Sequence, residues 1–177
     1  MNQFLPKAGL VVVAIMVTLF SFSVQAEKKK VPWSTKWGKA QVAMMSPNVF
    51  GKDHILVQWE RRDKASSPDP EWNVTEAVYY EQADEVAGSA AVTGYAVLIF
   101  KNGDKAFHRL DGAYTGTYRD NGAWEGTAEG LYRFLGGTGK YKNIKGTAVV
   151  RCKGVDPMFA KEVEDTGGCT MEGELEF

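Results

Sequence analysis

Short runs in which apolar and polar residues alternate, each ended by turn-forming residues, follow one another from Lys36 to the end of the chain. A period of two is the pattern of a β-strand with one buried face. Residues 54–62 show it clearly, with every second side chain on one face: Ile55, Val57, Trp59 and Arg61. Residues 75–87 fit either a strand or a short helix, and their tyrosines and valines favour the strand.

The turn residues between the runs indicate hairpins. Asn102-Gly103 separates two apolar runs, and Asp120-Asn121-Gly122 separates the next pair. We expect a type I′ turn at Asn102-Gly103, because both residues tolerate the positive φ that this turn requires. The remaining connections fall at the glycine-rich residues 136–139 and in a loop over residues 154–168.

About eight strands with short connections predict an all-β fold, a single antiparallel eight-stranded β-barrel of meander type over residues 36–177. Closure removes the exposed edges that an open sheet would leave. Residues 124–132 put small and aromatic side chains alternately on one face, as expected where a strand coils strongly: Trp124, Gly126, Ala128, Gly130 and Tyr132. Residues 27–35, with Lys28-Lys29-Lys30, are expected to be a flexible N-terminus.

Residues 1–26 have the pattern of a secretory signal peptide. Lys7 precedes an apolar stretch over residues 8–22, and Val24-Gln25-Ala26 offers small residues for cleavage. The stretch is short for a bilayer-spanning helix, which needs about 20 residues. A retained N-terminal anchor is the alternative. The style of the signal is bacterial, so we expect a periplasmic or secreted protein with no membrane association after cleavage.

Charge and cysteine content exclude several classes of function. Loss of Lys7 with the signal leaves 20 of the 21 basic side chains against 22 acidic ones, so no basic surface for nucleic acid or anionic lipid is expected. Cys152 and Cys169 are the two cysteines. In an exported protein such a pair predicts a disulfide, here closing a loop of about sixteen residues. No metal site and no cofactor is predicted, because His54 and His108 are remote from the cysteines in sequence.

The stretch 133–149, RFLGGTGKYKNIKGTAV, invites comparison with phosphate-binding loops. It fails that comparison, because Tyr141 stands where a P-loop has Ser or Thr and a strand-like run follows where a helix is needed. The structural interpretation is a corner between two strands, in which Gly136, Gly137 and Gly139 supply the unusual backbone angles. Tyr141 and Ile144 would then fold back to plug one end of the barrel.

The segment FLGGTGKYKNIKGTAV resembles the GGTG signature of the dirigent and allene oxide cyclase-like β-barrels, and the likeness extends over about residues 94–150. The resemblance implies an eight-stranded antiparallel barrel with an apolar cavity, often assembled as a homo-oligomer. Dirigent proteins hold radical intermediates for stereoselective coupling, and the cyclases fold an unstable epoxide for ring closure. No reactive residue of those proteins aligns with this chain, so no catalytic role carries over.

Candidate site residues follow from strand positions. Aromatic side chains on predicted strands would line a pocket for a flat or apolar ligand together with one histidine: Trp59, Tyr79, Tyr95, His108 and Trp124. If the protein is an enzyme, an acid–base group would come from His108, Glu60 or Glu125. An ordinary filled core is the alternative for all of these residues.

Three functions remain open at this stage. The first is an exported barrel that binds a small apolar or aromatic molecule, and the second is an isomerase or cyclase rather than a hydrolase. The third is a structural or interaction protein with a side-chain-filled barrel that acts through its outer surface. An internal cavity above about 300 Å³ would favour the first two, and a filled interior the third.

Overall fold

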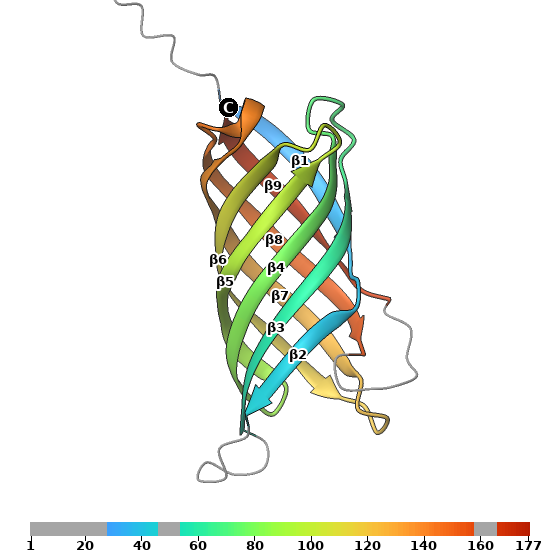
Figure 1. The fold of residues 1–177 in the computed structure, drawn as a ribbon. Coiled ribbons are helices and arrows are strands. Elements are labelled where there is room, and N and C mark those ends of the chain that lie inside the picture. Colours follow the sequence, from blue (N-terminus) through green and yellow to red (C-terminus); the bar gives the residue numbers. More distant parts are fainter. Residues whose placement is uncertain (1–27, 46–53, 158–165) are drawn as a thin grey trace, which may run out of the picture.

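The computed structural model describes residues 28–45, 54–157 and 166–177, and the predicted signal peptide lies outside them. The described chain is all-β, one antiparallel sheet of nine strands that closes on itself (Figure 1). The strands are β1 (Lys29–Lys36), β2 (Ala40–Met45), β3 (His54–Ser66), β4 (Val74–Val86), β5 (Ser89–Phe100), β6 (Lys105–Tyr118), β7 (Trp124–Gly137), β8 (Lys145–Asp156) and β9 (Gly168–Glu176). A single 3₁₀ turn, η2 (Gly139–Tyr141), interrupts this pattern within the described residues.

The sheet closes through β1, which pairs with β9 on one side and with the end of β3 on the other. β2 continues in the same direction along β3, so β1 and β2 share one place in the closed sheet. The strand pairing is interrupted between them at Trp37-Gly38-Lys39, where the Gly38 N–H donates to Asp63 Oδ1 at 3.0 Å. A side chain at Gly38 would overlap the Arg62 carbonyl oxygen, which explains glycine there.

Two expectations from the sequence were wrong at the level of strands. The stretch expected to be a flexible N-terminus contains β1, whose Val31 and Trp33 are buried. The flanking lysines and Pro32 concealed its alternation. Residues 104–112 and 113–119, which the turn pattern predicts as two separate runs, form one strand, β6, because Gly112 faces inward and lets the strand pass close over Gly130. The described residues form nine strands where about eight were expected.

Other expectations are confirmed. The inward face of β3 carries the apolar side chains predicted for it, and residues 74–86 form a strand and not a helix. Both predicted glycine-containing hairpins are present, but the turn at Asn102-Gly103 is not type I′, because only Gly103 has positive φ. Phe100 O accepts from the Gly103 N–H at 2.8 Å, and Asn102 Oδ1 caps the Asp104 N–H at 3.1 Å. Asn102 thus contributes its side chain and not a left-handed backbone.

The glycine-rich stretch forms the corner between β7 and β8. Gly136 and Gly139 have φ of +130° and +50°, and η2 follows directly. Tyr141 and Ile144 turn under the corner and are buried, 1% and 2% exposed. This corner helps to close the end of the sheet that also carries the C-terminus (Figure 1), called the closed end below.

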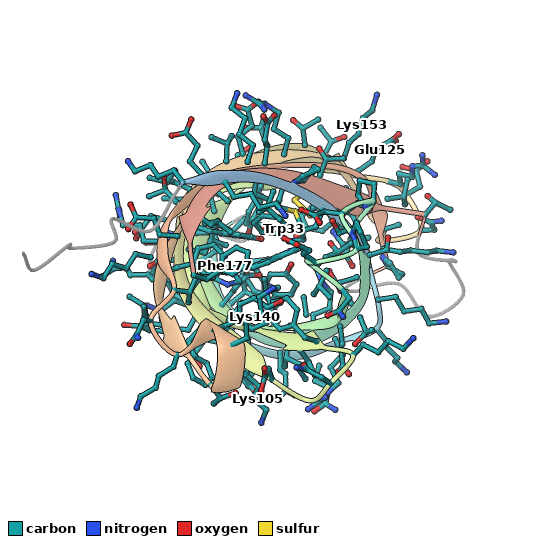
Figure 2. The ribbon with its side chains drawn as sticks, turned by 90° about the horizontal axis from the view of Figure 1, so that it is seen from above. Trp33, Lys105, Glu125, Lys140, Lys153 and Phe177 are labelled. Atoms are coloured by element: carbon teal, nitrogen blue, oxygen red, sulfur yellow. A yellow bond between two sulfur atoms is a disulfide. The ribbon has the colours of Figure 1, made fainter. Side chains whose placement is uncertain are left out.

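Trp72 fills the closed end. It is fully buried, and its ring lies 4.8 Å from Phe100, 5.3 Å from Tyr141 and 5.6 Å from Trp33 between centroids. Figure 2, which looks down the sheet from this end, shows Trp33 and Phe177 pointing inward while Lys105, Glu125 and Lys153 point outward. These aromatic rings pack against one another and occupy the interior at the closed end.

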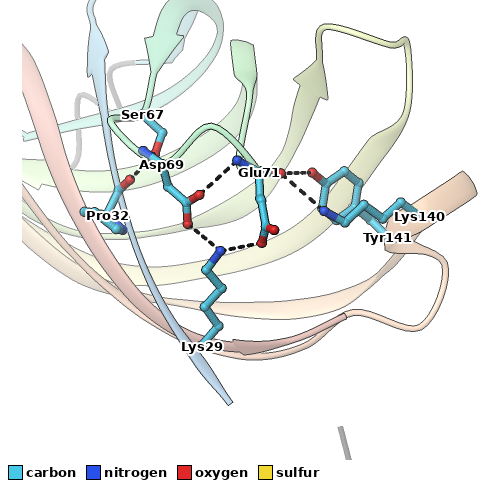
Figure 3. Close-up of polar contacts among 7 residues, drawn as sticks. All are labelled: Lys29, Pro32, Ser67, Asp69, Glu71, Lys140 and Tyr141. Carbon is cyan, nitrogen blue, oxygen red and sulfur yellow. Dashed lines mark hydrogen bonds and ion pairs between the residues drawn. The ribbon is translucent and has the colours of Figure 1, made fainter. Parts of the chain in front are cut away.

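The loop 67–73 that carries Trp72 is fastened by polar contacts (Figure 3). Lys29 Nζ lies 2.8 Å from Asp69 and 2.6 Å from Glu71. The Glu71 carbonyl oxygen accepts from Tyr141 Oη at 3.2 Å and from Lys140 Nζ at 3.3 Å. β1 and the glycine-rich corner therefore hold the loop from two sides.

Candidate functional site

A partly open pocket of about 80 Å³ lies in the half of the closed sheet away from Trp72. We call it the chamber. It is lined by five aromatic side chains, four charged ones and three small or aliphatic ones: Trp37, Trp59, Tyr114, Tyr118, Trp124, Arg61, Glu81, Glu85, Asp156, Val92, Ala128 and Cys152. Strands β3 to β8 and the break after β1 all contribute, so the sheet must close before the chamber exists.

Glycines on the strands make room for two of the tryptophan rings. The Trp124 ring lies against Gly116 and Gly126, where any Cβ would overlap it, and Trp124 Nε1 donates to the Gly88 carbonyl oxygen at 2.8 Å. The Trp37 ring lies against Gly167 in the same way, and Trp37 Nε1 lies 3.2 Å from Cys169 Sγ. The rings are therefore fixed in position, as a preformed wall requires.

The disulfide stands beside this wall. Cys152 on β8 and Cys169 on β9 are directly opposite each other in register and are joined, the pairing that the sequence predicts. Cys152 lines the chamber. The bond therefore ties together two strands next to the site.

Arg61 is the one cationic side chain among the residues that line the chamber, and it is bound by two carboxylates. Its Nε lies 3.0 Å from Asp63 Oδ1, and its Nη1 lies 3.3 Å from Asp156 Oδ2. Burial alone would lower the pKa of Arg61, but attraction to Asp63, Glu81 and Asp156 outweighs burial and raises it. The guanidinium also lies over the rings of Trp37 and Tyr79, 5.0 and 5.6 Å from their centroids.

Glu81 and Glu85 face the chamber from β4 in different environments. Burial raises the pKa of Glu81 to about 7, against the opposing effects of Arg61 and Trp59. The Trp59 indole nitrogen is close enough to affect Glu81 but is not in hydrogen-bond geometry. Glu85 accepts hydrogen bonds from Tyr114 Oη at 2.6 Å and Tyr118 Oη at 2.7 Å. Burial and the neighbouring Glu85 raise the pKa of both tyrosines.

The predicted ligand-binding residues are divided among three places. Trp59 and Trp124 line the chamber. Tyr79 and His108 are buried in the filled interior beside Tyr132, whose ring centroid lies 6.5 Å from that of Tyr79 and 4.2 Å from that of His108. Tyr95 lies on the outer face and is 57% exposed.

The three acid–base candidates are not brought together. His108 is fully buried, neither ring nitrogen has a hydrogen-bond partner, and burial lowers its pKa to about 3. Glu60 lies on the outer face of β3, 3.7 Å from Arg62 Nε. Glu125 is exposed on β7, where its carboxylate accepts from Arg119 Nε at 2.9 Å. None of the three lines the chamber.

Sequence reasoning missed the charged residues that define the chamber. Arg61 and Asp63 continue the inward face of β3, and Glu81 and Glu85 share the inward face of β4 with Tyr79. The signal was present, because charges at every second position beside buried aromatics fall on the same face of a strand. Without the register between strands, nothing in the sequence shows that these two faces meet.

The outer face has a shallow groove across β2 to β6. Tyr80 on β4 and Tyr95 on β5 are directly opposite each other and are 48% and 57% exposed. Around them lie polar side chains: Gln41, Gln58, Glu60, Gln82, Thr93 and Arg109. Exposed aromatic side chains in a polar setting mark a second surface with binding potential.

Two further structural findings and three comparisons complete the description. Among the described residues, no group of three histidine, cysteine, aspartate or glutamate side chains is arranged to hold a metal ion. No helix within the described ranges is long and apolar enough to cross a membrane. No protein-family model, curated protein or solved structure matches the chain.

Proposed function

We propose that this protein is an exported binding protein that holds a small ligand in the chamber. The observation that carries the proposal is a partly open pocket walled by five aromatic side chains, of which Trp37 and Trp124 are held in close contact with glycines. Aromatic walls with a few convergent polar groups are typical of ligand sites. Export is supported by the signal-like residues 1–26 and by the disulfide.

The size of the chamber limits the ligand. At about 80 Å³ it is well below the roughly 300 Å³ at which pockets for drug-sized molecules begin. This volume favours a small molecule or a head group over the larger flat or apolar ligand expected from the sequence.

The proposal also covers the type of barrel and the superfamily to which the fold belongs. Because β1 and β2 share one place beside β3, we propose that the closed nine-stranded sheet corresponds to an eight-stranded meander barrel with one divided strand. This arrangement and the glycine-rich corner support membership in the dirigent and allene oxide cyclase-like superfamily. The isomerase or cyclase alternative has less support, since none of the acid–base candidates His108, Glu60 and Glu125 lines the chamber.

Native mass spectrometry of protein purified from its own periplasm tests the proposal. We expect a retained small molecule in the wild type and its loss in Ala128→Leu, which fills the chamber from β7. Ala113→Leu, on the exposed face of β6, is the matched control and should retain the ligand. Empty wild-type protein in repeated preparations would overturn the proposal.

A second function is favoured by the outer groove, namely interaction through the outer surface. Tyr80 and Tyr95 offer adjacent aromatic faces, and Gln58, Gln82 and Arg109 offer hydrogen-bonding groups around them. This combination suits a carbohydrate chain, which presents apolar C–H faces and many hydroxyl groups. Binding to insoluble polysaccharides should fall at least tenfold in Tyr80→Ala and Tyr95→Ala and be unchanged in Ala128→Leu.

A further inference from the structure

From the charges around the chamber, we infer that its ligand is a small organic cation, an ammonium group carrying methyl or methylene groups, held between the aromatic wall and the carboxylates of Glu81 and Glu85. This inference rests on the proposed function and names the chemical class of its ligand. Three observations carry it: the charge count, the arrangement of hydrogen bonds around the carboxylates, and the aromatic wall.

The chamber has more negative than positive side chains. Arg61 is its one guanidinium, and the carboxylates of Asp63 and Asp156 already lie within 3.3 Å of it. Glu81 and Glu85 remain without an ion-pair partner at such distances among the described residues. Burying carboxylates without a counter-charge is costly, so the chamber favours the entry of positive charge.

The hydrogen bonds differ between these two carboxylates. Glu85 accepts from two tyrosine hydroxyls, Tyr114 Oη and Tyr118 Oη. Glu81 has no such donor in good geometry, and burial leaves its pKa near 7. Glu81 can therefore reduce the negative charge of the chamber by taking up a proton when no cation is bound. It can release that proton when a cation binds.

The wall of the chamber suits a cation that also has apolar surface. Trp59 and Tyr114 meet edge to face with their centroids 6.5 Å apart, and Tyr114 meets Trp124 in the same way at 5.5 Å. Tryptophan and tyrosine faces attract ammonium groups, most strongly where water is excluded. Arg61 over Trp37 shows one cation already bound in this manner.

The same observations argue against other ligands. An anion would meet the three carboxylates of Glu81, Glu85 and Asp156, and a neutral apolar molecule would leave Glu81 and Glu85 without compensation. A metal ion would need a set of three ligating side chains, and the described residues provide none. A methylated ammonium of a few non-hydrogen atoms satisfies the volume, the charge and the aromatic wall together.

Isothermal titration calorimetry with cations and neutral molecules of equal size tests the inference. Dimethylammonium is compared with ethanol, and tetramethylammonium with tert-butanol, each at constant ionic strength and pH 8. We expect at least one cation to bind at least tenfold more tightly than its neutral counterpart. Glu81→Gln and Glu85→Gln should each weaken the cation about tenfold and leave the alcohol unchanged, whereas Glu172→Gln on the exposed face of β9 should change neither.

A measurement on the wild type covers the case in which a variant does not fold. The groups that act on Glu81 through their charge or position are Arg61, Asp63, Asp156, Tyr79, Tyr114, Tyr132 and Trp59. Because cation binding favours the ionised Glu81, affinity should rise between pH 6 and pH 8 and binding should release protons into the buffer. Affinity that falls over this range would overturn the inference.

The outcomes separate the inference from the function beneath it. Equal binding of alcohols and cations, blocked by Ala128→Leu, would overturn the cation and leave a neutral-ligand chamber. Binding of neither kind of probe, together with empty native protein, would overturn both. Cation binding that Ala128→Leu does not reduce would place the cation outside the chamber and overturn the inference.

Discussion

Individual inward-facing residues set the pH dependence of this protein. Glu81 and His108 are both buried, and burial disfavours the charged form of each. For Glu81 the charged form is the one at high pH, and for His108 it is the one at low pH. Glu81 therefore lowers the stability of the fold as pH rises from 4.5 through 7, and His108 lowers it as pH falls from 6.5 towards 3.

We predict that Glu81→Gln reduces the loss of stability at rising pH. The folded-state pKa of about 7 lies above the ordinary 4.5, so the contribution of Glu81 is fully present below pH 4.5 and is lost as pH rises through 7. The loss amounts to roughly 3 kcal/mol. Urea unfolding from pH 4 to pH 9 measures it, and a variant with the slope of the wild type would contradict the assignment.

His108→Leu should stabilise the protein by about 1–2 kcal/mol at pH 7, because it removes two buried nitrogens without hydrogen-bond partners. It should also remove acid sensitivity. The folded-state pKa of about 3 lies below the ordinary 6.5, so wild-type stability falls as pH decreases from 6.5 towards 3, by up to roughly 5 kcal/mol. Thermal unfolding at pH 4 and pH 7 checks both effects. Destabilisation at pH 7 would show that the His108 side chain makes contacts that stabilise the folded state.

At this scale the sequence allows one kind of prediction and not another. Alternation assigns Trp59, Arg61 and Trp124 to the inward face correctly. It cannot assign the partners of Arg61, because Asp156 is 95 residues away and meets it only across the closed sheet. Tyr95 shows the same limit from the other side, since an aromatic residue on a strand fits either face until the register is known.

At the scale of strands and turns, glycines leave the space in which aromatic rings pack. Trp124 occupies the space that side chains at Gly116 and Gly126 would take, and Trp37 does the same at Gly167. The alternation of glycine along β7 is visible in the sequence, and the rings that it accommodates are not. The break between β1 and β2 was missed for a related reason, because Gly38 is needed for contact with a remote strand.

Gly116→Ala should destabilise the protein by about 2 kcal/mol or more, because the new Cβ would overlap both the Glu125 carbonyl oxygen and the Trp124 ring, where it would lie 2.6 Å from Cζ2. Gly103→Ala is the matched control. That position has φ of +86° but open space around it, so backbone strain alone should cost about 1 kcal/mol. Guanidinium unfolding compares them, with near-ultraviolet circular dichroism reporting on Trp124. Equal effects would mean that the ring can move aside.

The whole molecule is an aromatic-filled half joined to a charged, partly hollow half inside one closed sheet. The all-β class and the antiparallel meander could be predicted from the spacing of turns. The closed end could be predicted in part, since Tyr141 and Ile144 were expected to plug it, but Trp72 lies in a polar loop with no strand pattern. Closure through β1 depends on contacts between the two ends of the chain, which local patterns do not encode.

Reduction of the disulfide should lower the free energy of unfolding by about 3 kcal/mol, because Cys152 and Cys169 are 17 residues apart and their bond restricts the unfolded chain. Urea unfolding with and without reductant measures the change. The double variant Cys152→Ser, Cys169→Ser is the control and should not respond to reductant. Identical midpoints for the oxidised and reduced wild type would contradict the prediction.

Closure of the sheet through β1 has a consequence for how the chain folds. β1 pairs along its length with β9, and Trp37 contacts Cys169 across 132 residues of sequence. Such long-range pairing raises contact order. It slows folding because the entropy of loop closure is lost before the stabilising contacts form. Among the described strands, β1 therefore cannot complete the closed sheet until β9 has been synthesised.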